Sequence, residues 1–488
     1  MTFILAPLCA AALHIALPNV QVTAAVPMPP TDSMRALGEK PYCRVEATID
    51  EETRIAALLP DDWNGNFVMG GAGGYAGILQ NQMESSVHQG YATVGTDAGH
   101  TATGFTAEWA LHNDRRIADY GHRAVHRTAE VTKALITAYY GRPPDHSYFI
   151  GCSNGGREAL MEAQRYPADF DGIVAMAPAF NYLEISAAFV HNMQVQYPTG
   201  DFSAPVVTPG VLQLVAAKVT ESCDALDGVK DGTLENPEAC TFTLASLPAC
   251  ASDVAADGCV TGAQRAALVA FTTPMTAGSL RYPGWPFGDQ ADPEGWAAWI
   301  TGPVPEMVQM TGGTAATYQS VFVTQFFKYL VYGDPAWSYV GYDLARAGRD
   351  GARVETVVSA VNPDLSAFGA RGGKLMLIHG WSDPALSARA TIEYFEAVQR
   401  DTPQASSFTR LFLMPGVLHC GGGTGCDDVD YADIIRRWVE QGEAPSRIIA
   451  RKLDGVQVAR THPLCAYPMT ARYDGTGNTD DAAAFACR

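Results

Sequence analysis

The sequence has little positive charge and no long apolar run, and each shortage excludes a class of protein. It holds 33 Lys and Arg against 52 Asp and Glu, a formal net charge of −19, and its basic residues form no extended run. Duplex nucleic acid repels such a surface, so we expect no nucleic acid partner. No apolar run within the chain reaches the ~20 residues that a membrane-spanning helix needs. A hydrophobic fraction of 47% with only 17% charged residues predicts a globular protein.

The N-terminus lacks basic residues altogether but has the apolar stretch of a signal peptide. Residues 3–17 read FILAPLCAAALHIAL, and small residues typical of a cleavage site follow near Ala24–Ala25. We therefore expect a signal peptide over residues 1–25 and a secreted or periplasmic protein. No Lys or Arg precedes Arg35, so a misassigned start codon or a propeptide is the alternative interpretation.

The cysteines lack the C-x-x-C spacing that is typical of zinc sites. The chain has 11 of them, and removal of Cys9 with the signal peptide would leave 11 − 1 = 10. An even number in an exported chain indicates a disulfide framework, although spacing alone does not give its connectivity.

Strand and helix patterns alternate in two parts of the chain. Helical spacing of apolar side chains occurs at 115–140 and 387–400, and short buried strands are expected at 147–153, 172–179, 374–380 and 409–416. This alternation predicts an α/β fold with a parallel sheet.

Residues 182–370 do not follow that rhythm. They hold four of the cysteines, clusters of aromatic residues and many Gly and Pro. We interpret them as a lid inserted into a single core that is made of residues 26–181 and 371–488. An ordinary second domain in series is the alternative.

One serine lies in a motif that is typical of nucleophiles. Residues Gly151–Gly155 read GCSNG and fit G-x-S-x-G, in which the glycines permit a sharp turn that lifts the serine hydroxyl clear of a sheet. The motif stands between an expected strand and an expected helix, which is the context that it requires. It predicts Ser153 as the nucleophile of an α/β-hydrolase core with a large inserted lid domain. A structural glycine-rich turn is the alternative.

A serine hydroxyl needs a base that a third group orients. In this class of fold the acid and then the histidine follow the serine along the chain, each at the end of a strand. Asp383 and His419 fit that order. The alternatives are a helix N-cap for Asp383 and an ordinary loop position for His419. His379 is a rival base, but it precedes the acid, so we favour His419.

Cysteines adjoin two of these residues. Cys152 directly precedes Ser153, and Cys420 directly follows His419. If the serine and the histidine are hydrogen-bonded, their neighbours lie close enough for a disulfide. We therefore predict a Cys152–Cys420 bond that ties the nucleophile to the base.

Ester cleavage also needs two backbone N–H groups that stabilise the oxyanion. One is expected from Asn154, the residue after the nucleophile, and the other from the glycine-rich loop GGAGG at 70–74.

Three carboxylates, Asp224, Asp227 and Asp231, lie within the loop that Cys223 and Cys240 bracket. Oxygen ligands in this number suit Ca²⁺, although their spacing is not that of an EF-hand. A solvated acidic loop is the alternative.

Together these motifs resemble the tannase and feruloyl esterase family. The resemblance covers the GCSNGG motif, the CDALDGVKDG loop and the segments GKLMLIHGWSD and LFLMPGVLHC, and it reaches the end of the chain. It implies a secreted carboxylic ester hydrolase that uses Ser153, Asp383 and His419 on small esters of aromatic acids, hydroxycinnamic or gallic. A hydrolase of mono(hydroxyethyl) terephthalate is the alternative within the family. A non-catalytic, calcium-stabilised binding protein on the same scaffold is a less favoured alternative.

The resemblance also implies roles for further residues. The calcium ligands would be the side chains of Asp224, Asp227 and Asp231 with the carbonyls of Val229 and Thr233. The oxyanion donors would be Gly74 and Asn154, and the substrate-binding aromatic residue would be Trp299. The further disulfides would be Cys223–Cys240, Cys250–Cys259 and Cys465–Cys487. Cys43 then lacks the family's early partner and Cys426 is an extra, so whether these two pair stays open.

A substrate with a free carboxylate needs a cation in its pocket, ideally an arginine. Lys328 is the only cation between Arg281 and Arg346, and its aromatic surroundings, FVTQFFKYLVY, predict that it reaches to solvent. We therefore expect a terephthalate monoester to be a poor substrate. Further pocket aromatics are expected among Tyr318, Phe322, Phe326 and Phe327, with core packing as the alternative. The sequence leaves the oligomeric state open.

Overall fold

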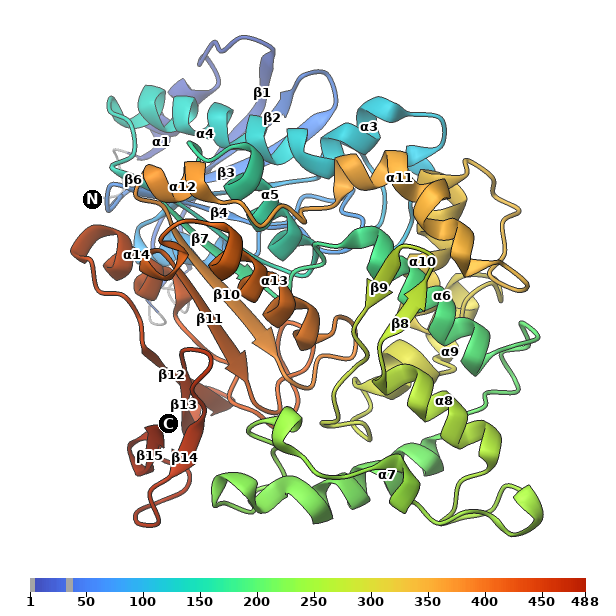
Figure 1. The fold of residues 1–488 in the computed structure, drawn as a ribbon. Coiled ribbons are helices and arrows are strands. Elements are labelled where there is room, and N and C mark those ends of the chain that lie inside the picture. Colours follow the sequence, from blue (N-terminus) through green and yellow to red (C-terminus); the bar gives the residue numbers. More distant parts are fainter. Residues whose placement is uncertain (1–4, 32–37) are drawn as a thin grey trace.

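The computed structural model describes residues 5–31 and 38–488, and one large sheet organises them (Figure 1). The order of its nine strands is β1-β2-β3-β5-β4-β6-β7-β10-β11. Their bounds are β1 Val20–Met28, β2 Tyr42–Ile49, β3 Thr53–Pro60, β4 Asn66–Gly70, β5 Ala92–Thr96, β6 His146–Cys152, β7 Gly172–Met176, β10 Lys374–Gly380 and β11 Thr409–Met414. The first four strands of this order pair antiparallel, and β5 through β11 pair parallel. The fold is therefore the predicted α/β class.

Helices cover both faces of the sheet. Those of the core are α1 Leu5–Ala12, α3 Asp114–Ala118, α4 Ala124–Tyr140, α5 Asn154–Arg165, α13 Ala388–Asp401 and α14 Tyr431–Gln441. Successive side chains of a strand point to opposite faces. Phe149 and Ile173 therefore join the hydrophobic cluster that α4, α5 and α13 share, whereas Ile150 and Val174 join the cluster of α14. The result is a buried sheet between two helical layers, which suits its continuous apolar strands.

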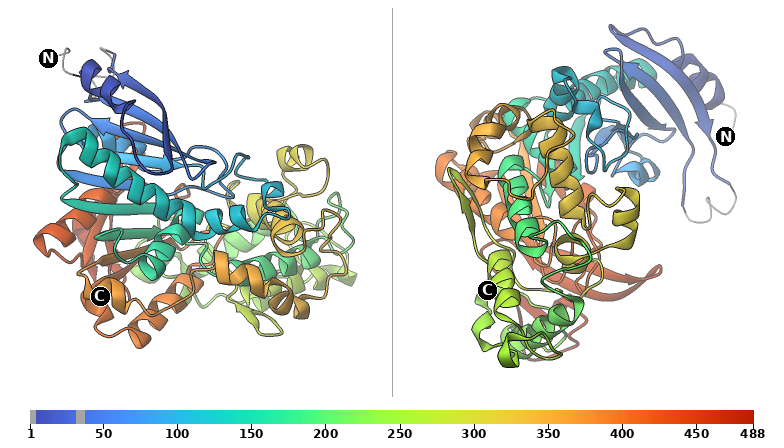
Figure 2. Two further views of the ribbon diagram at one scale, coloured as in Figure 1. Left: turned by 90° about the horizontal axis from the view of Figure 1, so that it is seen from above. Right: turned by 90° about the vertical axis from the view of Figure 1, so that its right-hand side faces the viewer.

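The segment 182–370 is an insertion between two neighbouring strands of this sheet. The chain leaves the sheet after β7 and returns at β10, which pairs directly with β7. The inserted elements are α6 Tyr182–Gln196, α7 Pro209–Cys223, α8 Gly262–Thr272, β8 Met275–Ala277, β9 Leu280–Tyr282, α9 Pro305–Met310, α10 Tyr318–Gln325, α11 Ala347–Val358 and α12 Ser366–Ala370. Most of the segment stands beside the core rather than within the sheet (Figures 1 and 2). We call it the lid below.

Short hairpins at the C-terminus support one loop of the lid. They are β12 Arg447–Asp454 with β13 Gln457–Cys465, and β14 Ala471–Tyr473 with β15 Phe485–Cys487. Val229, from the acidic loop of the lid, packs in one hydrophobic cluster with Cys465 and Phe485. The acidic loop is thus anchored to the far end of the chain.

The N-terminal segment is part of the fold, where the sequence predicted a signal peptide over residues 1–25. β1 pairs with β2 along its length, and Cys9 is bonded to Cys43 with the Cα atoms 5.5 Å apart. Cleavage near Ala24–Ala25 would divide β1 and remove Cys9, and the predicted signal peptide stays a prediction. An apolar stretch followed by small residues suits a packed helix and an edge strand as well as it suits a signal peptide. Residues 1–4 lie outside the described residues.

Five disulfides join the described part of the chain. Besides Cys9–Cys43 they are Cys152–Cys420, Cys223–Cys240, Cys250–Cys259 and Cys465–Cys487, the four that the sequence analysis anticipated. Cys43 and Cys426 therefore do not pair, and Cys426 is a buried free thiol. Within residues 5–31 and 38–488, no helix combines the length and the apolar character that a bilayer crossing requires.

Candidate active site

Ser153 lies at the turn between β6 and α5, in a backbone conformation that few residues adopt. Its φ of 65° and ψ of −121° are strained for a residue with a side chain. The surrounding glycines make the turn possible, because a Cβ on Gly151 would lie 2.5 Å from the Gly155 carbonyl oxygen. A Cβ on Gly155 would in turn lie 3.0 Å from the Cα of Gly71. The turn is the sharp strand-to-helix connection that the G-x-S-x-G motif predicts.

Ser153, His419 and Asp383 form one hydrogen-bonded chain. Nε2 of His419 lies 2.9 Å from Oγ of Ser153, and Nδ1 lies 2.8 Å from Oδ2 of Asp383. The histidine follows β11 and the aspartate follows β10, so the parallel strands bring all three residues to one edge of the sheet. With Nδ1–H donating to the carboxylate, Nε2 can accept the serine proton.

The surroundings of Asp383 keep its carboxylate ionised. Oδ1 accepts hydrogen bonds from the N–H groups of Ala385 and Leu386, at 2.8 and 2.9 Å. Burial alone would raise the pKa of Asp383, but His419 and His379 outweigh it and hold that pKa well below its usual range. A carboxylate that stays charged can stabilise an imidazolium on His419.

His379, the rival base, is engaged elsewhere. Its side chain is 1% exposed, with Nδ1 2.7 Å from Oγ1 of Thr391 and Nε2 3.0 Å from the Leu386 carbonyl. Nε2 also lies 3.3 Å from Oδ2 of Asp383. This histidine therefore supports the acid and does not contact the serine.

The disulfide Cys152–Cys420 joins the nucleophile turn to the histidine loop. Its Cα atoms are 5.9 Å apart, within the usual range for a disulfide. The bond connects the two neighbours of Ser153 and His419, as predicted, and it restricts how far those two residues can separate.

Gly74 and Asn154 line the same cavity as Ser153. The φ of Gly74 is 55°, and a Cβ at this position would lie 2.3 Å from the Gly104 carbonyl oxygen, so glycine is required there. The Tyr120 hydroxyl donates to the Gly74 carbonyl at 3.1 Å and fixes the orientation of that peptide. Gly74 and Asn154 thus both border the cavity that contains the Ser153 hydroxyl, the place where oxyanion donors are expected.

A buried charged network joins the side chain of Asn154 to the backbone of Ala72. The Glu158 carboxylate accepts from the Ala72 N–H and from Nδ2 of Asn154, each at 2.9 Å, and Nε of Arg157 donates to Oδ1 of Asn154 at 2.8 Å. Burial raises the pKa of Glu158 to about 7. Sequence reasoning missed Arg157 and Glu158, because in a helix of composition REALMEAQR they resemble solvent-exposed charges. Their position in the turns that follow the nucleophile was the available signal.

A small apolar cavity opens beside Ser153, between core and lid. It measures about 50 Å³, and its lining includes Tyr75, Tyr182, Phe189, Trp299 and Phe322. Among the described residues no Lys or Arg lines it. The ring of Trp299 lies 5.0 Å from that of His419 and 6.1 Å from that of Phe322, so Trp299 lies in the pocket as the family resemblance implies.

The other lid aromatics divide between support and core. The ring of Tyr318 lies 4.9 Å from that of Trp299 and backs it. Phe326 and Phe327 are fully buried, and Phe327 stacks on Trp337 at 4.7 Å. Neither phenylalanine lines the cavity, so both follow the alternative interpretation of core packing. Lys328 does not line the cavity either.

The cavity is smaller than an aromatic acid. A void of about 150 Å³ is the size that accepts benzene in an engineered protein interior. The cavity of about 50 Å³ therefore takes an aromatic ring only after side chains of the lid shift.

The carboxylates of the acidic loop of the lid are hydrogen-bonded to backbone N–H groups of the same loop. Oδ1 of Asp224 accepts from the Gly232 N–H at 2.9 Å, Oδ1 of Asp227 from the Val229 N–H at 3.0 Å, and Oδ1 of Asp231 from the Thr233 N–H at 3.0 Å. Burial, with the neighbouring charges of Asp231 and Glu235, raises the pKa of Asp227 to about 6. Asp227 is thus a half-buried carboxylate with a raised pKa, and carboxylate oxygen is the ligand type that a hard cation prefers. Asp231 already has one cationic neighbour, since Nη1 of Arg460 lies 3.1 Å from its Oδ2.

Comparison with known proteins agrees with this geometry. Residues 35–488 match the family model described as tannase and feruloyl esterase. The chain is 33% identical to mono(2-hydroxyethyl) terephthalate hydrolase of Piscinibacter sakaiensis, covering 94% of this chain and 86% of that protein. It is 30% identical to feruloyl esterase B of Aspergillus niger, covering 91% of this chain and 86% of the relative.

A solved structure matches equally well. The crystal structure of feruloyl esterase B from Aspergillus oryzae superposes with a TM-score of 0.86 at 26% identity, covering 99% of both chains. The chain therefore shares its overall fold with that esterase, and the fold is an α/β-hydrolase. The chain belongs to the tannase and feruloyl esterase family and is a carboxylic ester hydrolase.

Proposed function

We propose that the protein hydrolyses esters of neutral aromatic acids, such as hydroxycinnamic or gallic acid, with Ser153 as nucleophile, His419 as base and Asp383 as orienting acid. The observation that carries this proposal is the hydrogen-bonded chain of the three residues at the mouth of an aromatic cavity. The same intact chain favours an enzyme over a non-catalytic binding protein on this scaffold.

The reaction proceeds in two acyl-transfer steps. Oγ of Ser153 attacks the ester carbonyl while Nε2 of His419 takes its proton, and Asp383 stabilises the imidazolium. The backbone amides of Gly74 and Asn154 donate to the oxyanion. The alcohol leaves with the proton from His419, and a water molecule activated by the same nitrogen then releases the acid.

The cavity lining supports a neutral acid. A terephthalate monoester carries a second carboxylate, and burying that charge without a partner costs several kcal/mol. No cation lines the cavity within the described residues. Ser186 is a hydroxyl-bearing residue of the lining that suits a phenolic acid, whereas the Tyr75 hydroxyl already donates to the Phe322 carbonyl at 2.8 Å. The Piscinibacter relative keeps the terephthalate monoester as the second candidate.

We also propose that the acidic loop binds one Ca²⁺. Asp224, Asp227 and Asp231 would supply carboxylates, and Val229 and Thr233 carbonyls. Burial, together with the charges of Asp231 and Glu235, raises the pKa of Asp227, and a bound Ca²⁺ would offset both effects by stabilising the ionised carboxylate. The ion would hold the lid loop against the C-terminal hairpins and take no part in the chemistry.

We propose that the protein is exported from the cytoplasm, because it contains several disulfides. Five of them in one chain indicate folding in an oxidising compartment. This proposal does not depend on cleavage within residues 1–25.

A side-by-side substrate panel tests the proposed function. Methyl ferulate, methyl gallate and a terephthalate monoester would be assayed for kcat/KM with the purified chain. We expect the two neutral esters to exceed the charged one by at least about tenfold, the equivalent of ~1.4 kcal/mol. Equal values for the two classes would contradict the electrostatic argument, and turnover of none of them would contradict the enzyme assignment of the triad.

A further inference from the structure

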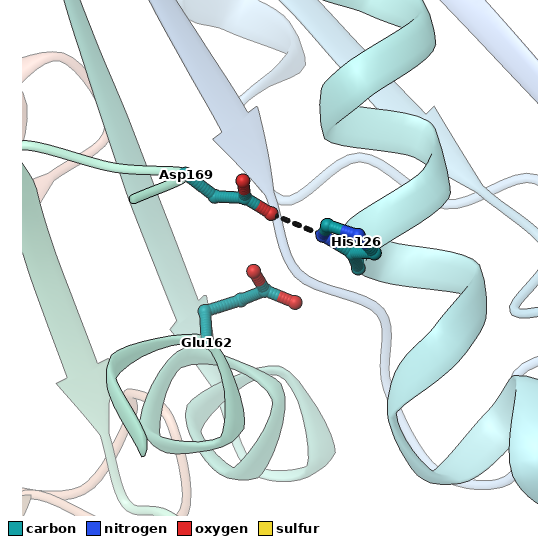
Figure 3. Close-up of side chains that lie close together, drawn as sticks. All are labelled: His126, Glu162 and Asp169. Carbon is teal, nitrogen blue, oxygen red and sulfur yellow. Dashed lines mark hydrogen bonds and ion pairs between the residues drawn. The ribbon is translucent and has the colours of Figure 1, made fainter. Parts of the chain in front are cut away.

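A second cluster of titratable side chains lies apart from the triad, between α4 and α5. It consists of His126 on α4, Glu162 on α5 and Asp169 in the segment that follows α5 (Figure 3). One ligand-type atom from each of the three lies within 4.8 Å of the other two. Glu162 is eight residues beyond Asn154, which places it about 12 Å along the helix from the oxyanion site.

Glu162 is the unusual member of the cluster. Its side chain is fully buried, and neither of its carboxylate oxygens has a hydrogen-bond partner among the described residues. Figure 3 shows this carboxylate pointing toward the space that His126 and Asp169 border. A buried carboxylate without a partner is costly, so the position requires either a cation or a proton.

The neighbours of Glu162 supply only part of the compensation. Nδ1 of His126 lies 2.6 Å from Oδ2 of Asp169, which engages that carboxylate and not Glu162. Nζ of Lys133 donates to the backbone carbonyl of Asp169. One lysine therefore stands near two carboxylates, and Glu130, 3.6 Å from Nε2 of His126, adds a third negative charge.

We propose that His126, Glu162 and Asp169 bind a divalent transition-metal cation, with Zn²⁺ as the expected ion. One imidazole nitrogen with two carboxylate oxygens is a ligand set that zinc accepts, whereas Ca²⁺ and Mg²⁺ prefer oxygen alone. The cation would replace the hydrogen bond between Nδ1 of His126 and Oδ2 of Asp169, which are 2.6 Å apart and would have to separate to admit it, and it would also reach Glu162. The side chain of His126 is 23% exposed, so a water molecule can complete the coordination. Binding would displace the proton that His126 and Asp169 share.

The site would be structural. It would join α5, the helix that follows the nucleophile, to α4 and to the turn before β7. The ring of His126 is already held in place, since it stacks on Tyr166 with ring centres 3.9 Å apart. The imidazole would therefore be preorganised as one ligand, which lowers the entropic cost of binding.

The alternative to a bound cation is a protonated Glu162, because burial and the neighbouring Asp169 raise the pKa of Glu162 well above its usual value. Glu162→Gln separates the two states. Glutamine mimics a protonated carboxyl in shape and can donate to Asp169, but it is a poor metal ligand. The variant should therefore keep the stability of the metal-free protein and lose the metal.

The test uses the full chain, stripped with chelator and then kept in excess Ca²⁺ so that the acidic lid loop is saturated. Zn²⁺ is titrated by calorimetry, and thermal unfolding is followed with and without Zn²⁺. We expect one Zn²⁺ per chain and a higher Tm. Glu162→Gln and His126→Gln should each weaken Zn²⁺ binding more than about 100-fold, beyond the effect of losing an outer-shell contact.

Glu130→Gln is the matched control, since it removes a carboxylate next to His126 but outside the proposed ligand set. It should weaken Zn²⁺ binding by no more than about tenfold, the low end of what loss of an outer-shell contact costs, because Glu130 lies 3.6 Å from Nε2 of His126. His126→Gln keeps the test decisive if Glu162→Gln fails to fold, because His126 is partly exposed. The proposal is overturned if the wild-type chain takes up no Zn²⁺, or if both ligand variants bind Zn²⁺ as tightly as the wild type.

Discussion

The core and the lid border one cavity, yet they hold their sides of it by different interactions. On the core side, Ser153, His419 and Asp383 are fixed by their positions at strand ends, by a disulfide and by hydrogen bonds of 2.8 to 2.9 Å. On the lid side, Trp299 and Phe322 contribute ring contacts from a segment that supplies no strand to the large sheet. We infer that the core sets the chemistry and that the lid sets which acyl group is accepted.

Loss of the nucleophile should give the largest effect, and it should not distinguish between esters. Ser153→Ala is expected to lower kcat on the order of 10⁶-fold for aromatic and acetyl esters alike, by analogy with serine proteases. Steady-state rates on nitrophenyl acetate and methyl ferulate would measure it. Ser186→Ala, which removes a hydroxyl from the lid side of the same cavity, is the control and should retain most activity. Residual activity above a tenth of the wild-type rate would mean that another residue is the nucleophile.

Removal of the Cys152–Cys420 bond should have the second-largest effect on the rate. The paired Cys→Ala variant keeps all three catalytic side chains but no longer restricts the distance from serine to histidine. A displacement of about 1 Å can cost ~100-fold in rate, so a loss of that order in kcat is expected on every ester. Removing Cys250–Cys259, a lid disulfide, is the comparison and should leave kcat unchanged. An unchanged rate in the Cys152–Cys420 variant would show that the strands alone position the base.

Trp299→Ala should affect one class of substrate and not the other. The lost aromatic contact is worth about 0.5–1.5 kcal/mol beyond its burial, which predicts a fall of roughly tenfold in kcat/KM for methyl ferulate. Nitrophenyl acetate, whose acyl group does not reach the indole, should change less than about threefold. Phe327→Leu in the buried part of the lid is the control for general loosening. Equal losses on both esters would assign Trp299 to the chemistry through His419 and not to selectivity.

Calcium should have the smallest effect on rate and a pH-dependent effect on stability. The pKa of Asp227 is about 6 in the folded chain, above the ordinary 3.8, so the metal-free fold binds this proton more tightly than the unfolded chain does. Stability of the metal-free protein is therefore lost as pH rises from about 4 through 6. Added Ca²⁺ should raise Tm more at pH 7 than at pH 5, with kcat unchanged.

Asp227→Asn sharpens that test. The variant keeps an amide oxygen but carries no charge at this position, so its Tm should respond to Ca²⁺ less than that of the wild type, and its metal-free form should be more stable than wild type at pH 7. A Ca²⁺ response as large as that of the wild type would place the ion elsewhere.

The motifs allowed much of the core to be anticipated from the sequence. G-x-S-x-G predicts a strand, a turn and a helix together, and Asp383 and His419 each directly follow a predicted strand. The positions of Cys152 and Cys420 next to two of these residues made their bond a geometric consequence. Short range is the common reason: each inference needed only the few residues around a motif.

Features that depend on long-range packing were not anticipated. The partner of Cys43 proved to be Cys9, because an apolar N-terminal stretch has the same composition whether it is removed or packed. Glu158 and Glu162 looked like surface charges until α4 and the sheet covered both sides of α5. The division of lid aromatics between pocket and core likewise depends on how the lid folds back on α6, which no local pattern encodes.

The long connection between β7 and β10 has a consequence for biosynthesis. Cys152 and Cys420 are 268 residues apart, and the whole lid is synthesised between them. During synthesis the nucleophile helix emerges early, while the strand that carries the histidine emerges near the end. Since chains begin to fold from the N-terminus, the first strands form before their catalytic partners exist. The nascent chain therefore carries an inactive serine, and hydrolytic activity begins only when nearly all of the protein has been made.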